Sequence, residues 1–288
     1  MNTGKLKFRL WALALLPMAS VPVLLAIMVF IGNAFFDLLL LQKVENDLAV
    51  ANSHLQHLQN EISAATLSVA KSRRIREFTH QPGGVLSEVL ASREENLDFD
   101  LLAVVDADGN VIGSSEETAP GGSYTQLGVL REALRSGRET SGLEVVPREY
   151  LMKLHASLSD KALVKLVDTP LAAPKAAREE GRGLMILAVA PMFDAGGQVM
   201  AYVLGGVLLN HRSGYVDYVR EIVSGGGLRQ MGVEGTVTLF LDDVRVETTV
   251  RDGNGDRAIG TRVSQTVKES VLDRVETWLQ RAFVVNHW

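Results

Sequence analysis

Residues 10–36 read LWALALLPMASVPVLLAIMVFIGNAFF, a run of 27 residues without Asp, Glu, Lys, Arg or His. A helix of about 20 apolar residues crosses a bilayer core of roughly 30 Å, so this run is long enough to span a membrane. Lys5, Lys7 and Arg9 precede it without any acidic residue, whereas the flank that follows is of mixed charge. Because positive charge marks the cytoplasmic side of a span, the sequence predicts a cytoplasmic N-terminus and an extracytoplasmic bulk.

A cleaved signal peptide is the alternative interpretation of this run. The apolar core of a signal peptide has about 7–15 residues and ends at a site of small residues. The run in this chain is longer, and no convincing cleavage site follows it. The sequence therefore favours an uncleaved, single-pass membrane anchor.

Residues 34–81 contain neither Gly nor Pro, which predicts a long helix directly after the span. Its apolar residues recur at alternating spacings of four and three, namely Val44, Leu48, Ala51, Leu55, Leu58, Ile62, Ala65 and Val69. This heptad seam favours a homodimer in which the helix pairs with a second copy of itself. Packing of the seam on the chain's own domain is the alternative, and both can hold along different parts of the helix. Pro82-Gly83-Gly84 ends the pattern.

Strand patterns follow in two groups. In the first group, strands are predicted over 101–106 and 111–114, helices over 124–135 and 148–167, a loop over 168–181, and strands over 183–190 and 199–209. Gly205-Gly206, inside the last strand, predicts a bulge or a close backbone approach. The second group has a helix over 211–223, a hinge at Gly225–Gly227, strands over 236–241 and 244–250, a helix over 267–279 and a further strand from Ala282.

These patterns predict an α+β fold with a transmembrane helix, a stalk helix and two modules that contain antiparallel sheets. The predicted parts are a cytoplasmic N-terminus (1–9), the transmembrane helix (10–36), the stalk (37–80), a first module (81–210), a connecting helix with a Gly-rich hinge (211–233) and a second module (234–288). By analogy with the first module, we expect the second to be truncated before a closing hairpin and a second span.

Several short motifs carry a family resemblance. They are Gly205-Gly-Val-Leu-Leu-Asn210 with Val216-Asp217, Gly235-Thr-Val-Thr-Leu-Phe240, Arg245-Val246 with Thr248, Arg257-Ala-Ile-Gly-Thr-Arg-Val-Ser264, and Ala282-Phe-Val-Val-Asn-His-Trp288. With the order of elements, they make residues 35–288 resemble the extracytoplasmic double Cache sensors, as a fusion of a Cache 3-type and a Cache 2-type module. The resemblance implies PAS-like modules, each with a central antiparallel sheet and helices on one side.

The resemblance also implies a location, with the anchor in a bacterial inner membrane, and a function. The parent protein would be a sensor histidine kinase of a two-component system or, alternatively, a chemotaxis receptor or a cyclic-dinucleotide enzyme. The region would bind a small solute, such as an amino acid or an organic acid, and relay a conformational shift across the membrane. No catalytic domain is recognised in the sequence, so an enzymatic activity would belong to the parent protein.

Aromatic residues and Arg are the usual polar anchors in a mostly apolar pocket, and an Arg fork matches a carboxylate. The predicted ligand-binding residues are Tyr124, Arg148, Tyr150 and Tyr202 in the first module and Arg245, Arg257 and Thr261 in the second. Each of them also fits a purely structural role, in the core or in a turn.

Composition excludes some functions. A net charge of −5 without a basic block gives no case for nucleic acid, and the absence of Cys removes disulfides, thiolate metal sites and Cys nucleophiles. We expect no metal and no cofactor. A membrane-anchored periplasmic enzyme is an alternative of another class, although the sequence has no Gly-x-Ser-x-Gly, His-Glu-x-x-His or P-loop motif. A structural scaffold with a stalk and no ligand pocket is the other alternative.

Overall fold

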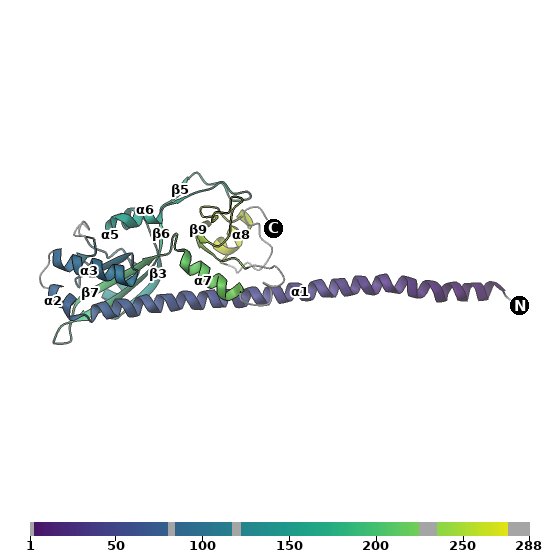
Figure 1. Ribbon diagram of the computed structural model, residues 1–288, viewed down its shortest axis with the longest axis horizontal. Coiled ribbons are helices and arrows are strands. Elements are labelled where there is room, and N and C mark those ends of the chain that lie inside the picture. The colour runs from purple at the N-terminus through teal and green to yellow at the C-terminus, as the bar shows by residue number, and fades with distance from the viewer. Residues whose placement is uncertain (1–2, 80–83, 117–121, 225–234, 276–288) are drawn as a thin grey trace. The chain divides into compact units, whose positions relative to one another are not determined.

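A computed structural model describes residues 3–79, 84–116, 122–224 and 235–275 (Figure 1). The chain forms two compact units, Met1–Val50 and Ala51–Trp288. The first unit belongs to helix α1, Thr3–Ala70. Across the part of the chain that the structure describes, no helix is both long enough and apolar enough to cross a membrane. The side chains of residues 1–20 lie outside that description, so the span over 10–36 stays a prediction.

The long helix ends earlier than its sequence pattern predicts. α1 stops at Ala70, and after a turn at Lys71-Ser72 the short helix α2, Arg73–Thr79, follows. This break has a packing reason, because Val69 and Ala70 are buried before the turn and Ile75 is completely buried after it. If α1 continued straight past Ala70, the helical rotation would turn the side chain of Ile75 away from the core.

The seam of α1 divides into an exposed part and a packed part. Val44 and Leu48 are exposed in the first unit, at 48% and 55% of their surface. In the second unit, Leu55, Ile62 and Val69 belong to or border the hydrophobic core. For these later positions, packing on the chain's own domain is the interpretation that the structure supports.

The centre of the second unit is a five-stranded antiparallel sheet with strand order β2-β1-β7-β6-β3. The strands are β1 Leu101–Val105, β2 Val111–Ser114, β3 Thr140–Val146, β6 Gly183–Phe193 and β7 Val199–Leu208. The predicted pairs 101–106 with 111–114 and 183–190 with 199–209 are confirmed. The edge strand β3 is not predicted by the sequence pattern.

Helices cover both faces of this sheet, whereas the resemblance implies helices on one side only. Alternate residues of β1 enter two different clusters: Leu102 and Val104 pack with α1, α2 and α3 (Gly84–Leu97), and Leu101, Ala103 and Val105 pack with the helices that follow β2. Side chains of a strand point alternately to its two faces, so both faces are buried. This double burial explains why β1, β6 and β7 are continuous apolar runs rather than alternating ones.

The segment after β2 is broken more often than expected. The predicted helix 124–135 is α4, Gly128–Ser136, which ends at Gly137 in the left-handed conformation. The predicted helix 148–167 is α5, Arg148–Leu154, then α6, Ala156–Ala162, and then strand β4, Val164–Lys165, which pairs with β5, Glu179–Glu180, in the predicted loop. His155 causes the break, because it is extended and its ring accepts a hydrogen bond from the Ser157 amide as the N-cap of α6.

The second group of elements forms a smaller layer in the same unit. Helix α7, Ser213–Ser224, packs its buried residues against residues 51–58 of α1 and against the hairpin of β8, Thr238–Leu241, and β9, Val244–Thr248 (Figure 1). Helix α8, Gln265–Lys268, continues as a π-helical turn, Glu269–Asp273. The predicted hinge at 225–227, the rest of the predicted helix 267–279 from residue 276 onward and the predicted strand from Ala282 lie outside the described residues.

The glycine pair in β7 marks a close approach rather than a bulge. The register with β1 and β6 is continuous at Gly205 and Gly206, and the shift lies instead between Met192 and Phe193. A Cβ atom at Gly205 would collide with the Thr66 hydroxyl of α1 and would lie 2.6 Å from the Phe99 ring. The glycine therefore lets α1 lie directly on the sheet.

We expect Gly205→Ala to lower the free energy of unfolding by about 1–3 kcal/mol, because Thr66 and Phe99 are buried and have no room to move. Gly214→Ala is the control, since nothing lies within 4 Å of the added methyl and the residue is in a helix. That variant should be neutral or more stable by up to about 1 kcal/mol. Denaturant unfolding of both variants measures the effect, and equal stabilities would contradict the close packing of α1 on β7.

Candidate functional site

Three of the predicted ligand residues are tyrosines of the first module. Tyr124, Tyr150 and Tyr202 belong to one apolar cluster between the sheet and helices α4 to α6, and each is at most 4% exposed. The Tyr124 hydroxyl donates to the carbonyl of Leu154 at 3.3 Å, and that of Tyr150 donates to the carbonyl of Ser123 at 3.3 Å. Burial raises the pKa of Tyr124 and of Tyr150 to about 12. The structure thus brings these rings together, with two of the hydroxyls already bonded to main-chain oxygens.

Arg148, the fourth candidate of this module, lies elsewhere. It lines an open groove of about 570 Å³ together with Pro147, Arg178 and Gly181. Its Nε donates to the Ser159 hydroxyl at 3.3 Å, and its Nη1 lies 3.6 Å from the Glu179 carboxylate. The groove contains basic and acidic side chains in similar number, so it has no clear preference for one sign of charge.

Arg245 and Thr261 are brought together in the second module. The Nη1 of Arg245 donates to the Thr261 hydroxyl at 2.8 Å, and that hydroxyl donates in turn to the carbonyl of Ala258 at 2.6 Å. Backbone hydrogen bonds join the same segments, because the Arg245 amide donates to the Thr261 carbonyl and the Gly260 amide donates to the Arg245 carbonyl, both at 2.9 Å. Arg245 is therefore held by a short segment that runs antiparallel beside β9.

The charge of Arg245 is buried without compensation. The side chain is 4% exposed, and among the described residues no carboxylate lies within ion-pair distance of it. Burial lowers its pKa to about 10, so the guanidinium remains protonated at neutral pH. An uncompensated buried charge costs on the order of several kcal/mol. The Phe240 ring, 5.1 Å below the guanidinium carbon, offsets only about 0.5–2 kcal/mol of this by cation–π attraction.

Arg257 is compensated and has a structural position. Its guanidinium donates to the Asp217 carboxylate of α7 at 2.6 Å, to Glu247 of β9 at 3.3 Å and to the carbonyl of Thr248 at 2.7 Å. The hydrogen bond that Arg257 donates to Asp217, together with the negative charges of Asp217 and Glu247, raises the pKa of Arg257. Arg257 thereby ties α7 to the β8–β9 hairpin, and its donors are largely used.

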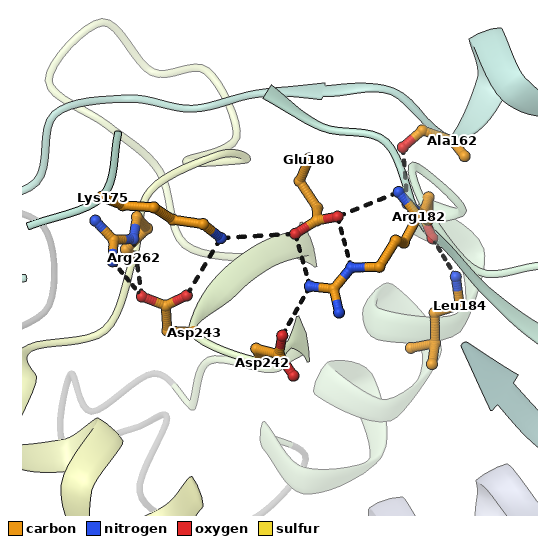
Figure 2. A network of polar contacts seen from close by, with 9 residues as sticks. Ala162, Lys175, Glu180, Arg182, Leu184, Asp242, Asp243 and Arg262 are labelled. Atoms are coloured by element: carbon orange, nitrogen blue, oxygen red, sulfur yellow. Dashed lines mark hydrogen bonds and ion pairs between the residues drawn. The ribbon is translucent and has the colours of Figure 1, made fainter. Parts of the chain in front are cut away.

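A polar network that the sequence pattern does not predict joins the two modules. Residues 163–182, here called the strap, run from the end of α6 to the start of β6, and they carry Lys175, Glu180 and Arg182. Figure 2 shows the Lys175 ammonium between the carboxylates of Glu180 and Asp243, at 3.7 and 3.8 Å. Asp242 and Asp243 form the tight turn of the β8–β9 hairpin in the second module.

Arginines complete this network. Arg182 donates to Glu180 at 2.8 Å and to Asp242 at 2.7 Å, and Arg262 donates to Asp243 at 2.5 Å (Figure 2). Glu180 and Asp243 are only 6% and 3% exposed. The charged residues of this segment are visible in the sequence, but their partners Asp242 and Asp243 are more than about 50 positions away, and no local pattern shows them.

Backbone contacts fix the strap on the second module. The Val167 amide donates to the Gly260 carbonyl at 2.9 Å, and the Gln265 amide donates to the Leu171 carbonyl at 2.8 Å. Gly260 has a φ of +81°, and a Cβ atom there would collide with the carbonyl of Lys165. Only glycine combines this conformation with such a close approach. The strap therefore touches the segment that holds Arg245.

Within the described ranges, no group of three or more His, Asp or Glu side chains is arranged to hold a metal ion. In the network around Glu180, the carboxylates form ion pairs with Lys and Arg side chains.

Two known protein families match this chain. A family described as "Double sensory domain of two-component sensor kinase" matches residues 40–225, more than half of the chain. The chain belongs to this family. A second family, described as "Single cache domain 3", matches residues 207–288 of this double sensory domain protein. The resemblance to the double Cache sensors is thereby confirmed.

The solved structures that match this chain include periplasmic sensor domains. The periplasmic domain of Vibrio cholerae LuxQ is 16% identical and aligns over 72% of this chain and 79% of its own, with a TM-score of 0.43. The E. coli DcuS sensor domain is 16% identical over 56% of this chain and 96% of its own, with a TM-score of 0.37. The sensor domain of the V. cholerae histidine kinase DctB is 11% identical over 73% and 67%, with a TM-score of 0.42. No curated protein matches the chain.

We expect Glu180→Gln to reduce the free energy of unfolding by about 2 kcal/mol at pH 7, because it removes charged hydrogen bonds to Arg182. Burial alone would raise the pKa of Glu180, but the bonds from Arg182 and the charge of Lys175 lower it overall. The ionised Glu180 therefore adds to the free energy of unfolding above about pH 4.3, the pKa of Glu in an unfolded chain. This stabilisation is lost as the pH falls through the lower pKa that Glu180 has in the folded state.

Urea unfolding at pH 7 and at pH 3 measures this effect. The difference in the free energy of unfolding between wild type and Glu180→Gln should be smaller at pH 3. Glu179→Gln is the matched control, since that side chain is 47% exposed and its ion pair is long. It should change stability by less than about 0.5 kcal/mol. A Glu180→Gln effect that is equal at both pH values would contradict the ionised network.

Proposed function

We propose that this chain is the extracytoplasmic, solute-sensing region of a membrane-anchored two-component sensor kinase. Membership of the double sensory domain family supports the kinase over a chemotaxis receptor or a cyclic-dinucleotide enzyme. The apolar run at 10–36 and its basic N-terminal flank support a single-pass anchor with the sensory fold outside the cytoplasm. The solute is a small molecule, such as an amino acid or an organic acid.

The observation that carries this proposal is the way α1 is built into the sensory fold. Ile62, Thr66 and Val69 of α1 are buried in the core, and the Tyr215 hydroxyl of α7 donates to the Ala51 carbonyl at 3.1 Å. A change in the packing of the sheet or of α7 must therefore displace α1. Helix shifts of about 1–2 Å at packed interfaces are a common form of signal transfer.

The exposed seam residues Val44 and Leu48 support a homodimer in this proposal. Two large apolar side chains at heptad spacing, both about half exposed, are suited to pairing with a second copy of the helix. A pair of α1 helices would then carry the displacement toward the membrane. A purely structural scaffold would share this dimer but would not respond to a solute.

Thermal unfolding of the full chain in detergent against a panel of amino acids, organic acids and amines tests the proposal. A ligand present at 100 times its Kd stabilises the folded state by about 2.7 kcal/mol, which corresponds to a rise in Tm of roughly 5–10 °C for a chain of this size. We expect such a rise with one chemical class and none with sucrose at equal concentration. A panel of millimolar solutes that leaves the Tm unchanged throughout would contradict solute sensing and favour the scaffold.

A further inference from the structure

One edge of the Arg245 guanidinium is unused. Nη1 is bonded to Thr261, whereas Nε is fully buried and has no hydrogen-bond partner. Among the described residues, nothing accepts a hydrogen bond from Nη2 either. Nε and Nη2 lie on the same side of the planar guanidinium, and their two N–H groups form the fork that binds a carboxylate in a bidentate manner.

Four other arginines that connect elements of the two modules differ from Arg245 in having a carboxylate partner. Arg182 has Asp242 at 2.7 Å, Arg212 has Asp100 at 2.9 Å, Arg257 has Asp217 at 2.6 Å and Arg262 has Asp243 at 2.5 Å. All four are more exposed than Arg245, yet each has a carboxylate partner from this chain. Arg245 is the one buried arginine of the described residues, and its partner is a neutral hydroxyl.

We propose that Arg245 is the anchor for the carboxylate of a small solute, bound in the second module; this inference rests on the proposed sensory function and names the ligand class and the site. The carboxylate would occupy the Nε and Nη2 edge and complete the ion pair that the chain leaves open. The free edge offers one positive charge and two N–H donors, so a single carboxylate group matches it better than a phosphate dianion does.

The neighbours of Arg245 have separate roles in this site. Thr261 uses its proton on the carbonyl of Ala258, so its hydroxyl can only accept from Arg245 and acts as a positioning residue. Phe240 lies opposite Arg245 in the hairpin, at the shift in register, and is only partly buried. Its ring is the side chain that would move to admit the ligand and then cover it.

The site is also joined to the strap. Gly260 and Thr261 bond to the backbone of Arg245, and the Gly260 carbonyl accepts from the Val167 amide. Movement of Arg245 toward a bound carboxylate would therefore be transmitted to residues of the strap that continue into β6. This is a direct covalent and hydrogen-bonded route from the second module to the central sheet.

The test compares the full chain with Arg245→Lys and Arg245→Met, using acetate, succinate and glycine as probes and sodium chloride at equal ionic strength as the reference. Lys keeps the charge and loses the fork, so the carboxylate that binds wild type best should bind at least 10-fold more weakly. Arg245→Met should show no carboxylate-dependent rise in Tm. Without any probe, its Tm should equal or exceed that of wild type, because an uncompensated buried charge has been removed. Arg251→Lys, at an exposed arginine of the same module, is the matched control and should behave as wild type.

Each outcome decides between the site and the broader function. Equal carboxylate shifts in wild type and in Arg245→Lys would overturn the site and leave solute sensing in place. A shift produced only by uncharged or cationic solutes would overturn the ligand class. A markedly lower Tm of Arg245→Met without probes would also overturn the proposal, because it would show that Arg245 stabilises the fold by itself. No shift with any solute would overturn both this inference and the proposed function.

Discussion

Asp243 is almost completely buried, and the cations that neutralise it come from two different parts of the chain. Arg262 belongs to its own module, whereas Lys175 belongs to the strap and also reaches Glu180. A buried carboxylate without cationic partners would be strongly destabilising, so the contact of Lys175 with both Asp243 and Glu180 favours the strap lying on the hairpin turn. The arrangement of the two modules depends on this shared compensation of charge. Because the strap begins at α6 and ends at β6, the same constraint reaches the centre of the sheet.

The strap and the hairpin turn lie between the proposed solute site and the central sheet. The strap contacts Gly260, and Gly260 contacts Arg245, a buried arginine for which no described residue supplies an anion. In the same compact unit, Gly205 allows α1 to pack closely on the sheet through Thr66. In the proposed mechanism, a carboxylate bound at Arg245 displaces the strap. The strap then displaces β6, and the sheet displaces α1. Every step of this route is a contact within the second compact unit.

Much of the fold could be predicted from the sequence, because it rests on local patterns. The apolar runs at 101–105, 183–193 and 199–208 are buried on both faces and therefore lack alternation, and turn residues such as Asp194–Gly197 fix the hairpin. β3 was missed, because it is an edge strand whose Leu143 and Val145 are exposed. The single helix expected over 148–167 is broken, because His155 caps a new one, which is a side-chain effect that periodicity does not register.

The site was only partly predictable for a related reason. Chemistry alone singled out Arg245 and Thr261, and the structure brings them together at 2.8 Å. The same reasoning also chose Arg257, which proves to be paired with Asp217 and Glu247. Whether an arginine is compensated depends on residues far away in the sequence, so the sequence could propose these residues but could not rank them. The network of Lys175, Glu180 and Asp243 is long-range in the same sense.

Hydrogen exchange of the full chain, followed by mass spectrometry, tests the central claim that the strap and the Arg245 segment form one unit. Peptides covering 163–182 and 258–265 should be protected in wild type, and Asp243→Asn should increase exchange in both together while β1 and β7 stay protected. Rapid exchange of the strap in wild type, or loss of protection in only one of the two segments, would contradict the account.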